Sequence, residues 1–379
     1  MMKSTMQAAV VEDFNKIPQI KEIQVPQPQA GQVLIKVLAA SINNVTRSRA
    51  NGSHYSAGQA TGFVAGLDGV GQTDDGKLYY FMGSEGQYGS FAQYTLVDQH
   101  HLLPLPLSTD AASLAASMNP ALSSWMAIRQ QLSAGVKGKK VLILGATGNA
   151  GKLAIEISRY LGAQAIIGVA RNAEALQQLN LDGRVLLDDH LAQNLQPYAD
   201  VDVVLDYLYG QPAADLMTAL LAARTEHDRL LEWVQIGSIA GPKVTLPANY
   251  LRSNNLRLLG SGLGSIAAAT FGKELFLLAQ LIAAGNFTVD NYPVPLTELN
   301  EKNWYENQHR VVYLPNQPWQ AQPVPFVDKI KFAVMKTVVS QKLKVNLDNS
   351  SPCIISWLIN FLVRLAISVV SSVEAVFKT

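Results

Sequence analysis

Residues 141–151 read Val-Leu-Ile-Leu-Gly-Ala-Thr-Gly-Asn-Ala-Gly, and the amphipathic stretch Lys152–Leu161 follows directly. This order predicts a buried strand, a tight turn and the start of a helix. Such a turn lets backbone N–H groups approach a pyrophosphate, whose negative charge the helix dipole favours. Glycines alone are a weak signal, but between a strand and a helix they predict a dinucleotide site. The residues predicted to form it are Gly145, Ala146, Thr147, Gly148, Asn149, Ala150 and Gly151.

The residues after the next apolar strand, Ala165–Ala170, bear on which dinucleotide is bound. An NAD site usually has an acidic residue there to hold the ribose 2′-hydroxyl, whereas this chain has Arg171 and Asn172. A guanidinium can clamp a 2′-phosphate that an acid would repel. The alternative is a solvated arginine at the start of helix Ala173–Leu179, although the helix dipole disfavours arginine in a first turn. NADPH is therefore the predicted cofactor.

Composition narrows the class of protein. The 379 residues suit two domains with an appendage, and 48% hydrophobic against 16% charged residues allows large cores. A net charge of +1 gives no electrostatic case for nucleic-acid binding. Cys353 is the only cysteine, which excludes an internal disulfide and a cysteine-rich zinc site. The first thirteen residues have no continuous apolar core of a signal peptide, so we expect a cytoplasmic protein.

The pattern of apolar residues changes along the chain. Residues 6–110 carry short apolar runs separated by turn residues, which predicts a β-rich unit. Two helices are then expected, Ala111–Met118 and Ser123–Leu132. Further on, strands alternate with helical patterns and predict a parallel sheet. The predicted strands are Val141–Leu144, Ala165–Ala170, Arg184–Leu187, Asp202–Asp206, Trp233–Ile236 and Leu256–Gly260, and a late helix, Phe271–Ala284, precedes a final strand, Val311–Leu314.

Seven short strings occur in an order that resembles the medium-chain dehydrogenase/reductase superfamily, in its zinc-free quinone-oxidoreductase branch. The resemblance covers about residues 6–315. Single strings of this kind match by chance, whereas seven in the right order do not. They are Ala40–Asn44, Gly66–Gly71, Gly89–Tyr94, Asn119–Trp125, Gly145–Gly151, Gln235–Ser238 and Gly260–Gly264.

The resemblance implies an α/β fold, with a GroES-like β-rich catalytic domain split in sequence around a doubly wound Rossmann domain. The catalytic domain would comprise residues 1–118 and 265–320, the NADP-binding domain 119–264, and a helical tail 321–379. The active site would lie in the cleft between the domains. Zinc alcohol dehydrogenases of this superfamily have a Gly-His-Glu string where this chain has Gly66-Leu67-Asp68. Since leucine cannot ligate zinc, we expect no metal site, and alcohol dehydrogenase activity is disfavoured.

By resemblance, Asn43 and Ser123 would lie near the nicotinamide, and the glycine turn would hold the pyrophosphate. The cofactor path would be lined by Tyr207, Ile236, Gly237 and Ser238, with Gly262 and Gly264 closing over it. Each assignment has a structural alternative. Asn43 could be a turn former before Val45, Ser123 a cap for the helix that follows, and Tyr207 a core residue. Gly262 and Gly264 could be ordinary loop glycines.

The implied reaction is hydride transfer from NADPH to a quinone or an activated enone, small-molecule acceptors that need no Lewis acid. Tyr55, beside His54 in the loop after Asn51-Gly52, is the third catalytic candidate, with a surface-loop role as its alternative. No convincing general acid is found, so water or substrate would supply the proton. The alternative function belongs to a class other than enzymes: a non-catalytic NADPH-binding or membrane-associated scaffold protein.

Beyond Pro315 the resemblance ends. Residues 329–344 alternate basic and apolar side chains, and 352–377 form an apolar run with one polar stripe. Arg364, near the middle of that run, disfavours a membrane span. We therefore expect a helix in the membrane interface, with peripheral membrane contact through residues 329–377. Three alternatives remain for this segment. It could pack on the enzyme's own domain, it could pack on a second subunit of a homodimer, or it could be an extension that selection has not retained for the enzyme's function.

Overall fold

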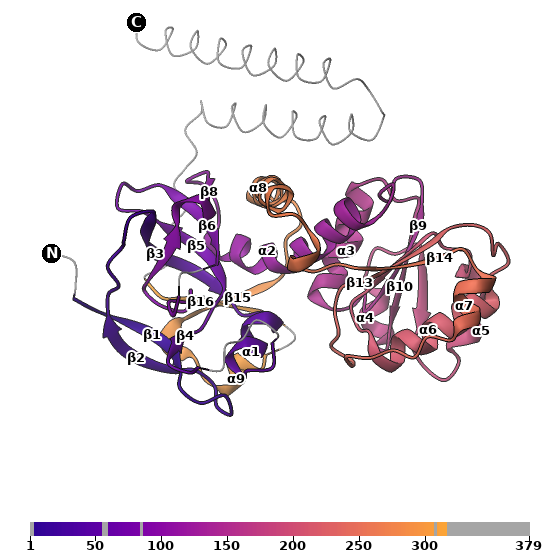
Figure 1. Cartoon of the computed structure of the whole chain (residues 1–379), viewed down its shortest axis with the longest axis horizontal. Coiled ribbons are helices and arrows are strands. Elements are labelled where there is room, and N and C mark those ends of the chain that lie inside the picture. The colour runs from indigo at the N-terminus through magenta and orange to yellow at the C-terminus, as the bar shows by residue number, and fades with distance from the viewer. Residues whose placement is uncertain (1–3, 55–59, 84–85, 307–308, 317–379) are drawn as a thin grey trace, which may run out of the picture.

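The computed structural model describes residues 4–54, 60–83, 86–306 and 309–316, and this part of the chain forms two bodies side by side along the long axis (Figure 1). One body contains the N-terminal strands and the last described strand. The middle of the chain forms the other, and two helices, α2 (Ala111–Met126) and α8 (Ala268–Ala283), lie between them. The predicted tail, 321–379, and the catalytic candidate Tyr55 lie outside the described residues.

The second body is a six-stranded parallel sheet in the order β11-β10-β9-β12-β13-β14. Numbered from β9 along the chain, this is the order 3-2-1-4-5-6 of a doubly wound sheet, as predicted. Its central strands are buried on both faces, which accounts for their continuous apolar sequence. The strands are β9 Lys140–Leu144, β10 Ala165–Ala170, β11 Gly183–Leu186, β12 Val203–Asp206, β13 Leu231–Gln235 and β14 Leu256–Gly260. The helices are α3 Asn149–Tyr160, α4 Ala173–Gln177, α5 Leu191–Leu195, α6 Gly210–Ala223 and α7 Ala248–Ser253.

The first body is β-rich, and the last two described strands of the chain complete its larger sheet. Strand β16, Arg310–Leu314, pairs antiparallel with β3, Gln32–Ser41, and β15, Asn291–Pro295, lies parallel to β16. A seven-stranded sheet has the order β15-β16-β3-β5-β6-β8 with β7 on β3, and a three-stranded sheet has the order β2-β1-β4. The other strands are β1 Thr5–Val11, β2 Gln19–Gln24, β4 Phe63–Val64, β5 Asp68–Gln72, β6 Leu78–Met82, β7 Tyr94–Asp98 and β8 Leu102–Leu105, and the helices are α1 Asn44–Ala50 and α9 Glu301–Trp304.

Helix α2, Ala111–Met126, is continuous where the sequence predicted two helices. Asp110 caps it, since its carboxylate accepts hydrogen bonds from the backbone N–H groups of Ala112 and Ser113. Pro120 lies inside the helix and removes one backbone donor, yet almost every residue around it is buried. Burial against both bodies therefore outweighs the local cost of the proline.

The predicted helix start at Ser123 is wrong for the same reason. Ser123 lies within α2, and its Oγ donates a 2.8 Å hydrogen bond to the carbonyl oxygen of Pro120, one turn earlier. A mid-helix serine that bonds back in this way is not a cap. A π-helical turn, Ala127–Gln131, then ends the segment.

Helix α8, Ala268–Ala283, leads the chain back from the parallel sheet to the β-rich body. Because α2 runs across the boundary predicted at residues 118 and 119, no break in the helix marks that boundary. The domain limits 1–118, 119–264 and 265–320 stay a prediction. Within the described ranges, no helix combines the length and apolar character needed to cross a bilayer.

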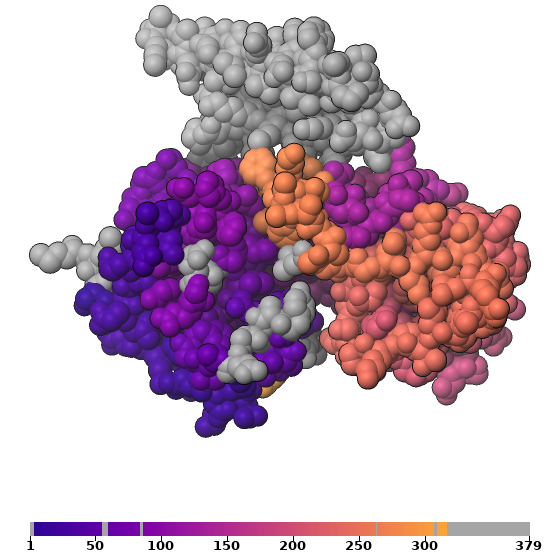
Figure 2. Space-filling model, in the orientation of Figure 1, coloured from indigo at the N-terminus to yellow at the C-terminus, as the bar shows by residue number. Residues whose placement is uncertain are grey.

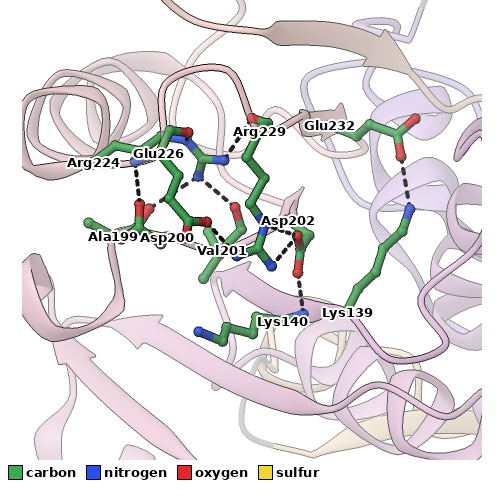
Figure 3. Close-up of polar contacts among 10 residues, drawn as sticks. All are labelled: Lys139, Lys140, Ala199, Asp200, Val201, Asp202, Arg224, Glu226, Arg229 and Glu232. Atoms are coloured by element: carbon green, nitrogen blue, oxygen red, sulfur yellow. Dashed lines mark hydrogen bonds and ion pairs between the residues drawn. The ribbon is translucent and has the colours of Figure 1, made fainter.

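The amino ends of the central parallel strands carry an ionic network (Figure 3). Arg224, which is buried after α6, donates to the carbonyl oxygens of Val201 (2.7 Å) and Arg229 (2.9 Å), among others. Arg229 in turn pairs with Asp202 and Glu226, each at 2.6 Å. These charge-assisted contacts stabilise the edge of the sheet where the parallel strands begin. The glycine turn lies at the opposite edge, where β9 ends.

Candidate active site

The turn after β9 needs glycine at two positions for different reasons, and a third glycine starts the helix. Gly145 has a φ of +93°, which favours glycine, and its N–H donates to the carbonyl oxygen of Val169 (2.9 Å). A Cβ on Gly151 would lie 2.3 Å from the carbonyl oxygen of Gly145, so only glycine lets α3 approach β9 this closely. Gly148 begins the helix as its N-cap and supplies no side-chain cap.

The first turn of α3 presents backbone donors that the helix itself does not use. The N–H groups of Asn149, Ala150 and Gly151 have no acceptor one turn earlier in the helix. Ala146 differs from them, since its N–H donates to the carbonyl oxygen of Val169 at 3.2 Å. The turn stands between β9 and β12, where the strand order reverses, and ligands of doubly wound sheets bind at this point. The arrangement can hold a diphosphate against a helix N-terminus.

Arg171 and Asn172 follow β10, the strand next to β9, and so lie at the same edge of the sheet. The side chain of Arg171 is exposed. Asn172 is the N-cap of α4, because its Oδ1 accepts a 3.0 Å hydrogen bond from the N–H of Ala175. The cap leaves Arg171 outside the helix, where its side chain avoids the unfavourable first-turn position.

Tyr207, directly after β12, is buried and joins three elements. Its Oη lies 2.6 Å from Oγ of Ser124 on α2, and that Oγ donates to the carbonyl oxygen of Ala150 on α3 (3.4 Å). Burial raises the pKa of Tyr207 above its ordinary value, so the phenol stays neutral. The core-packing alternative therefore describes what this side chain does in the structure.

Three other predicted cofactor residues, Ile236, Gly237 and Ser238, directly follow the neighbouring strand β13. The N–H groups of Ile236 and Gly237 both donate to the carbonyl oxygen of Asp206, at 2.8 and 3.1 Å. A Cβ on Gly237 would lie 2.4 Å from the carbonyl oxygen of Tyr207, so glycine is required here too. Ser238 is exposed. The fold thus brings the ends of β9, β12 and β13 together, as the sequence predicted.

Gly262 and Gly264 lie beyond β14, at the far side of the sheet from β11. A Cβ on either would meet nothing within 4 Å, and Gly262 has an extended backbone that any residue adopts. No packing requirement distinguishes them from ordinary loop glycines. Their predicted closure over a cofactor stays a prediction.

Asn43, the first predicted catalytic residue, is buried and caps α1. Its Oδ1 accepts from the N–H and Oγ1 of Thr46, at 2.8 and 3.1 Å. Its Nδ2 donates to Oδ1 of Asp68 at 3.4 Å. The polar atoms of the side chain therefore have partners within the β-rich body, and its exposed fraction is 1%.

A buried polar cluster centred on Asp68 was not predicted from the sequence. Oη of Tyr80 donates a 2.8 Å hydrogen bond to Oδ2 of Asp68. Burial raises the pKa of Asp68 to about 6, against the opposing effects of the Tyr80 hydrogen bond and the charge of Arg310. Nε of Arg310 donates to Oγ of Ser41 (3.2 Å), while its buried Nη2 has no hydrogen-bond partner among the described residues. The available signal was an acidic residue at the first position of strand β5.

No three His, Cys, Asp or Glu side chains among the described residues form a group that could hold a metal ion. At the position of the zinc-ligand string, Leu67 precedes the buried Asp68. The absence of a metal site in the whole chain stays a prediction.

No protein-family model matches the chain. It is 31% identical over 326 residues to the probable NADPH-dependent quinone reductase tdiC of Emericella nidulans, covering 73% of this chain and 90% of that one. It is 29% identical over 224 residues to the chloroplastic NADPH-dependent alkenal/one oxidoreductase of Arabidopsis thaliana. That second match covers 53% of this chain and 57% of the relative.

Among solved structures, the fold is similar to the quinone oxidoreductase from Thermus thermophilus, which is described alone and in its complex with NADPH. The TM-score is 0.68 and the identity 21%, and the match covers 82% of this chain and 100% of the other. At this identity the likeness establishes the fold. It confirms the predicted combination of a β-rich domain with a doubly wound parallel sheet.

Proposed function

The chain belongs to the medium-chain dehydrogenase/reductase superfamily, with quinone oxidoreductases among its relatives, and from this premise we propose that it is an NADPH-dependent reductase of quinones or activated enones. The observation that carries the proposal is the turn from Gly145 to Gly151, where α3 presents uncapped backbone donors at the reversal of strand order. NADPH supplies hydride from its nicotinamide when it is bound.

The residues of the glycine turn fit a dinucleotide diphosphate. The close packing of Gly151 on Gly145 places the first turn of α3 at the sheet edge, where its N–H groups can hold the phosphates. The exposed guanidinium of Arg171 at the same edge would bind the ribose 2′-phosphate. The main chain at Ile236 and Gly237, fixed to Asp206, would border the path of the cofactor.

The proposed acceptor is electrophilic enough to need no zinc. Leu67 occupies the position of a histidine ligand in zinc members and offers no donor atom. Asp68 is enclosed by Tyr80 and Asn43, so its carboxyl group is not available to an acceptor in the cleft. We therefore assign proton delivery to water or to the acceptor itself, and the main contribution of the protein is to hold donor and acceptor in contact.

The test is an assay of NADPH oxidation by the full-length chain with a panel of quinones and enones, alongside calorimetry with NADPH and NADH. Turnover with at least one acceptor and preferential heat of binding with NADPH are expected. Tight NADPH binding without turnover on any acceptor would instead support the non-catalytic scaffold. No binding of either nucleotide would overturn both.

Membrane contact through residues 329–377 and a homodimer stay predictions. Flotation of the full-length chain with vesicles that contain anionic lipid tests the first. Sedimentation equilibrium tests the second. Protein that stays entirely unbound at low salt, where electrostatic attraction is strongest, would contradict membrane contact.

A further inference from the structure

Glu274 on α8 accepts four hydrogen bonds from the end of α2 and the π-turn that follows it. Trp125 donates through Nε1 at 2.7 Å, and Arg129 donates through Nε and Nη2 at 2.8 and 2.9 Å. Gln130 adds a fourth bond at 3.0 Å. The guanidinium of Arg129 also lies 4.9 Å from the ring centre of Trp125. One carboxylate thus binds three side chains of another element.

The π-turn is what lets all three donors reach the same carboxylate. In an α-helix, residues five apart point about 140° away from each other. Trp125 and Gln130 are five residues apart, and the π-turn Ala127–Gln131, which has more residues per turn than an α-helix, follows Trp125 and reduces that angle. Gln130 therefore joins Trp125 and Arg129 on the side that faces α8. Single π-turns inside helices occur frequently at functional sites.

The two elements joined by Glu274 are the two connections between the bodies. The chain enters the parallel sheet after α2 and leaves it through α8, and Trp125 and Glu274 are 149 residues apart in sequence. Figure 1 shows both helices between the sheets, and in Figure 2 the orange atoms of α8 lie where the two bodies meet. A bond between these connections restrains how the bodies are oriented.

The contact is also largely shielded from water. The side chains of Arg129 and Glu274 are 18% and 11% exposed. An ion pair with two parallel hydrogen bonds in this setting is more directional than a surface pair. Its geometry is therefore suited to holding one orientation.

We propose that Glu274 is a positioning residue that sets the relative orientation of the two bodies, and with it the distance from the nicotinamide to the acceptor. The inference rests on the proposed function for its catalytic consequence, since cofactor and acceptor are then held on opposite sides of the cleft. Hydride transfer depends steeply on that distance, and a misplacement of about 1 Å can cost about a hundredfold in rate. The cofactor cradle itself lies within one body.

The variants Glu274→Gln and Glu274→Ala test this proposal, with Glu232→Gln as the matched control. Glu232 is also a buried carboxylate in an ion pair, with Lys139 at 3.2 Å, but both partners belong to the parallel-sheet body. Single-turnover NADPH oxidation, NADPH affinity and small-angle scattering are measured for the full-length chain.

In the Glu274 variants, the hydride-transfer rate should fall at least about tenfold, the NADPH dissociation constant should stay within about twofold, and the scattering should show a wider range of domain arrangements. Glu232→Gln should lower the melting temperature without the loss of rate. Equal loss of rate in the control, or unchanged scattering in the Glu274 variants, would overturn the proposal. If the wild type turns over no acceptor, the proposed function fails, while the scattering comparison still decides the role of Glu274.

Discussion

The Oη of Tyr207 and the Oγ of Ser124 lie 2.6 Å apart and join the end of β12 to helix α2. Both atoms are buried, and Ser124 continues the contact to the first turn of α3. A buried hydroxyl without its partner is costly, so Tyr207→Phe and Ser124→Ala should each lower the free energy of unfolding by about 1 kcal/mol. Urea denaturation of both variants measures this.

The double variant shows whether the two hydroxyls act together. Its loss should be smaller than the sum of the single losses, with a coupling energy of about 1 kcal/mol. Strict additivity would mean that the contact does not form in solution. A fall in NADPH affinity in Tyr207→Phe alone would reveal an additional role at the cofactor, as the family resemblance implies.

Gly151→Ala should remove both stability and NADPH binding. The added carbon would lie 2.3 Å from the carbonyl oxygen of Gly145 and 2.7 Å from Cα of Ala146, so α3 must move away from β9. Overpacking of this kind typically costs roughly 1–3 kcal/mol. Thermal unfolding and calorimetric titration check both effects.

Gly148→Ala is the matched control in the same turn. The nearest atom to its added carbon is the carbonyl oxygen of Gly145 at 3.5 Å, and its φ of −74° suits alanine. We expect a nearly unchanged melting temperature but weaker NADPH binding, because the methyl group would stand at the proposed diphosphate position. Unchanged affinity in this variant would contradict the placement of the diphosphate.

Arg171→Ala should separate the two nicotinamide cofactors. If the guanidinium binds the 2′-phosphate, loss of charged hydrogen bonds worth about 1.5–3 kcal/mol raises the NADPH dissociation constant by about tenfold or more. The NADH constant should change little. Fluorescence titration with both cofactors measures the difference.

Asn172→Ala is the neighbouring comparison. Asn172 is also predicted to be a cofactor-binding residue, but its Oδ1 caps α4, and only Arg171 is predicted to clamp the 2′-phosphate. Asn172→Ala should cost about 1 kcal/mol of stability and affect both cofactors equally. Equal weakening of NADPH and NADH in Arg171→Ala would show that this arginine has no part in cofactor choice.

The raised pKa of Asp68, about 6, predicts a pH-dependent stability. Near pH 4 and above, roughly, the carboxyl of the unfolded chain ionises, whereas the buried carboxyl stays protonated up to about pH 6. The contribution of Asp68 is therefore fully present at low pH and is lost as the pH rises through this window, by roughly 3 kcal/mol. Above the window the contribution is constant.

Asp68→Asn should abolish that slope, since the amide does not titrate and its oxygen can still accept from Tyr80. The difference in unfolding free energy between wild type and variant, measured in urea from about pH 4 to about pH 8, isolates this one group. A difference that stays constant across the window would mean that the pKa of Asp68 is not raised.

Local sequence determined the parallel sheet and the glycine turn. The central strands are apolar on both faces, and Gly145 and Gly151 are required by a backbone angle and a close approach that belong to one short segment. Strand, turn and helix there are neighbours in the chain, so their pattern can be read from consecutive residues. The same holds for Arg171, whose position follows from its distance beyond the turn.

Only the tertiary structure decided how residues distant in sequence meet. The sequence predicted two separate helices, but burial of α2 between two bodies kept one helix continuous through Pro120 and placed Ser123 in mid-helix instead of at a cap. Asp68 has a raised pKa because the assembled β-rich body buries it. Glu274 meets Trp125 across 149 residues. The free energy of these contacts comes from packing and exclusion of water between elements, which depend on the assembled layers and not on local pattern.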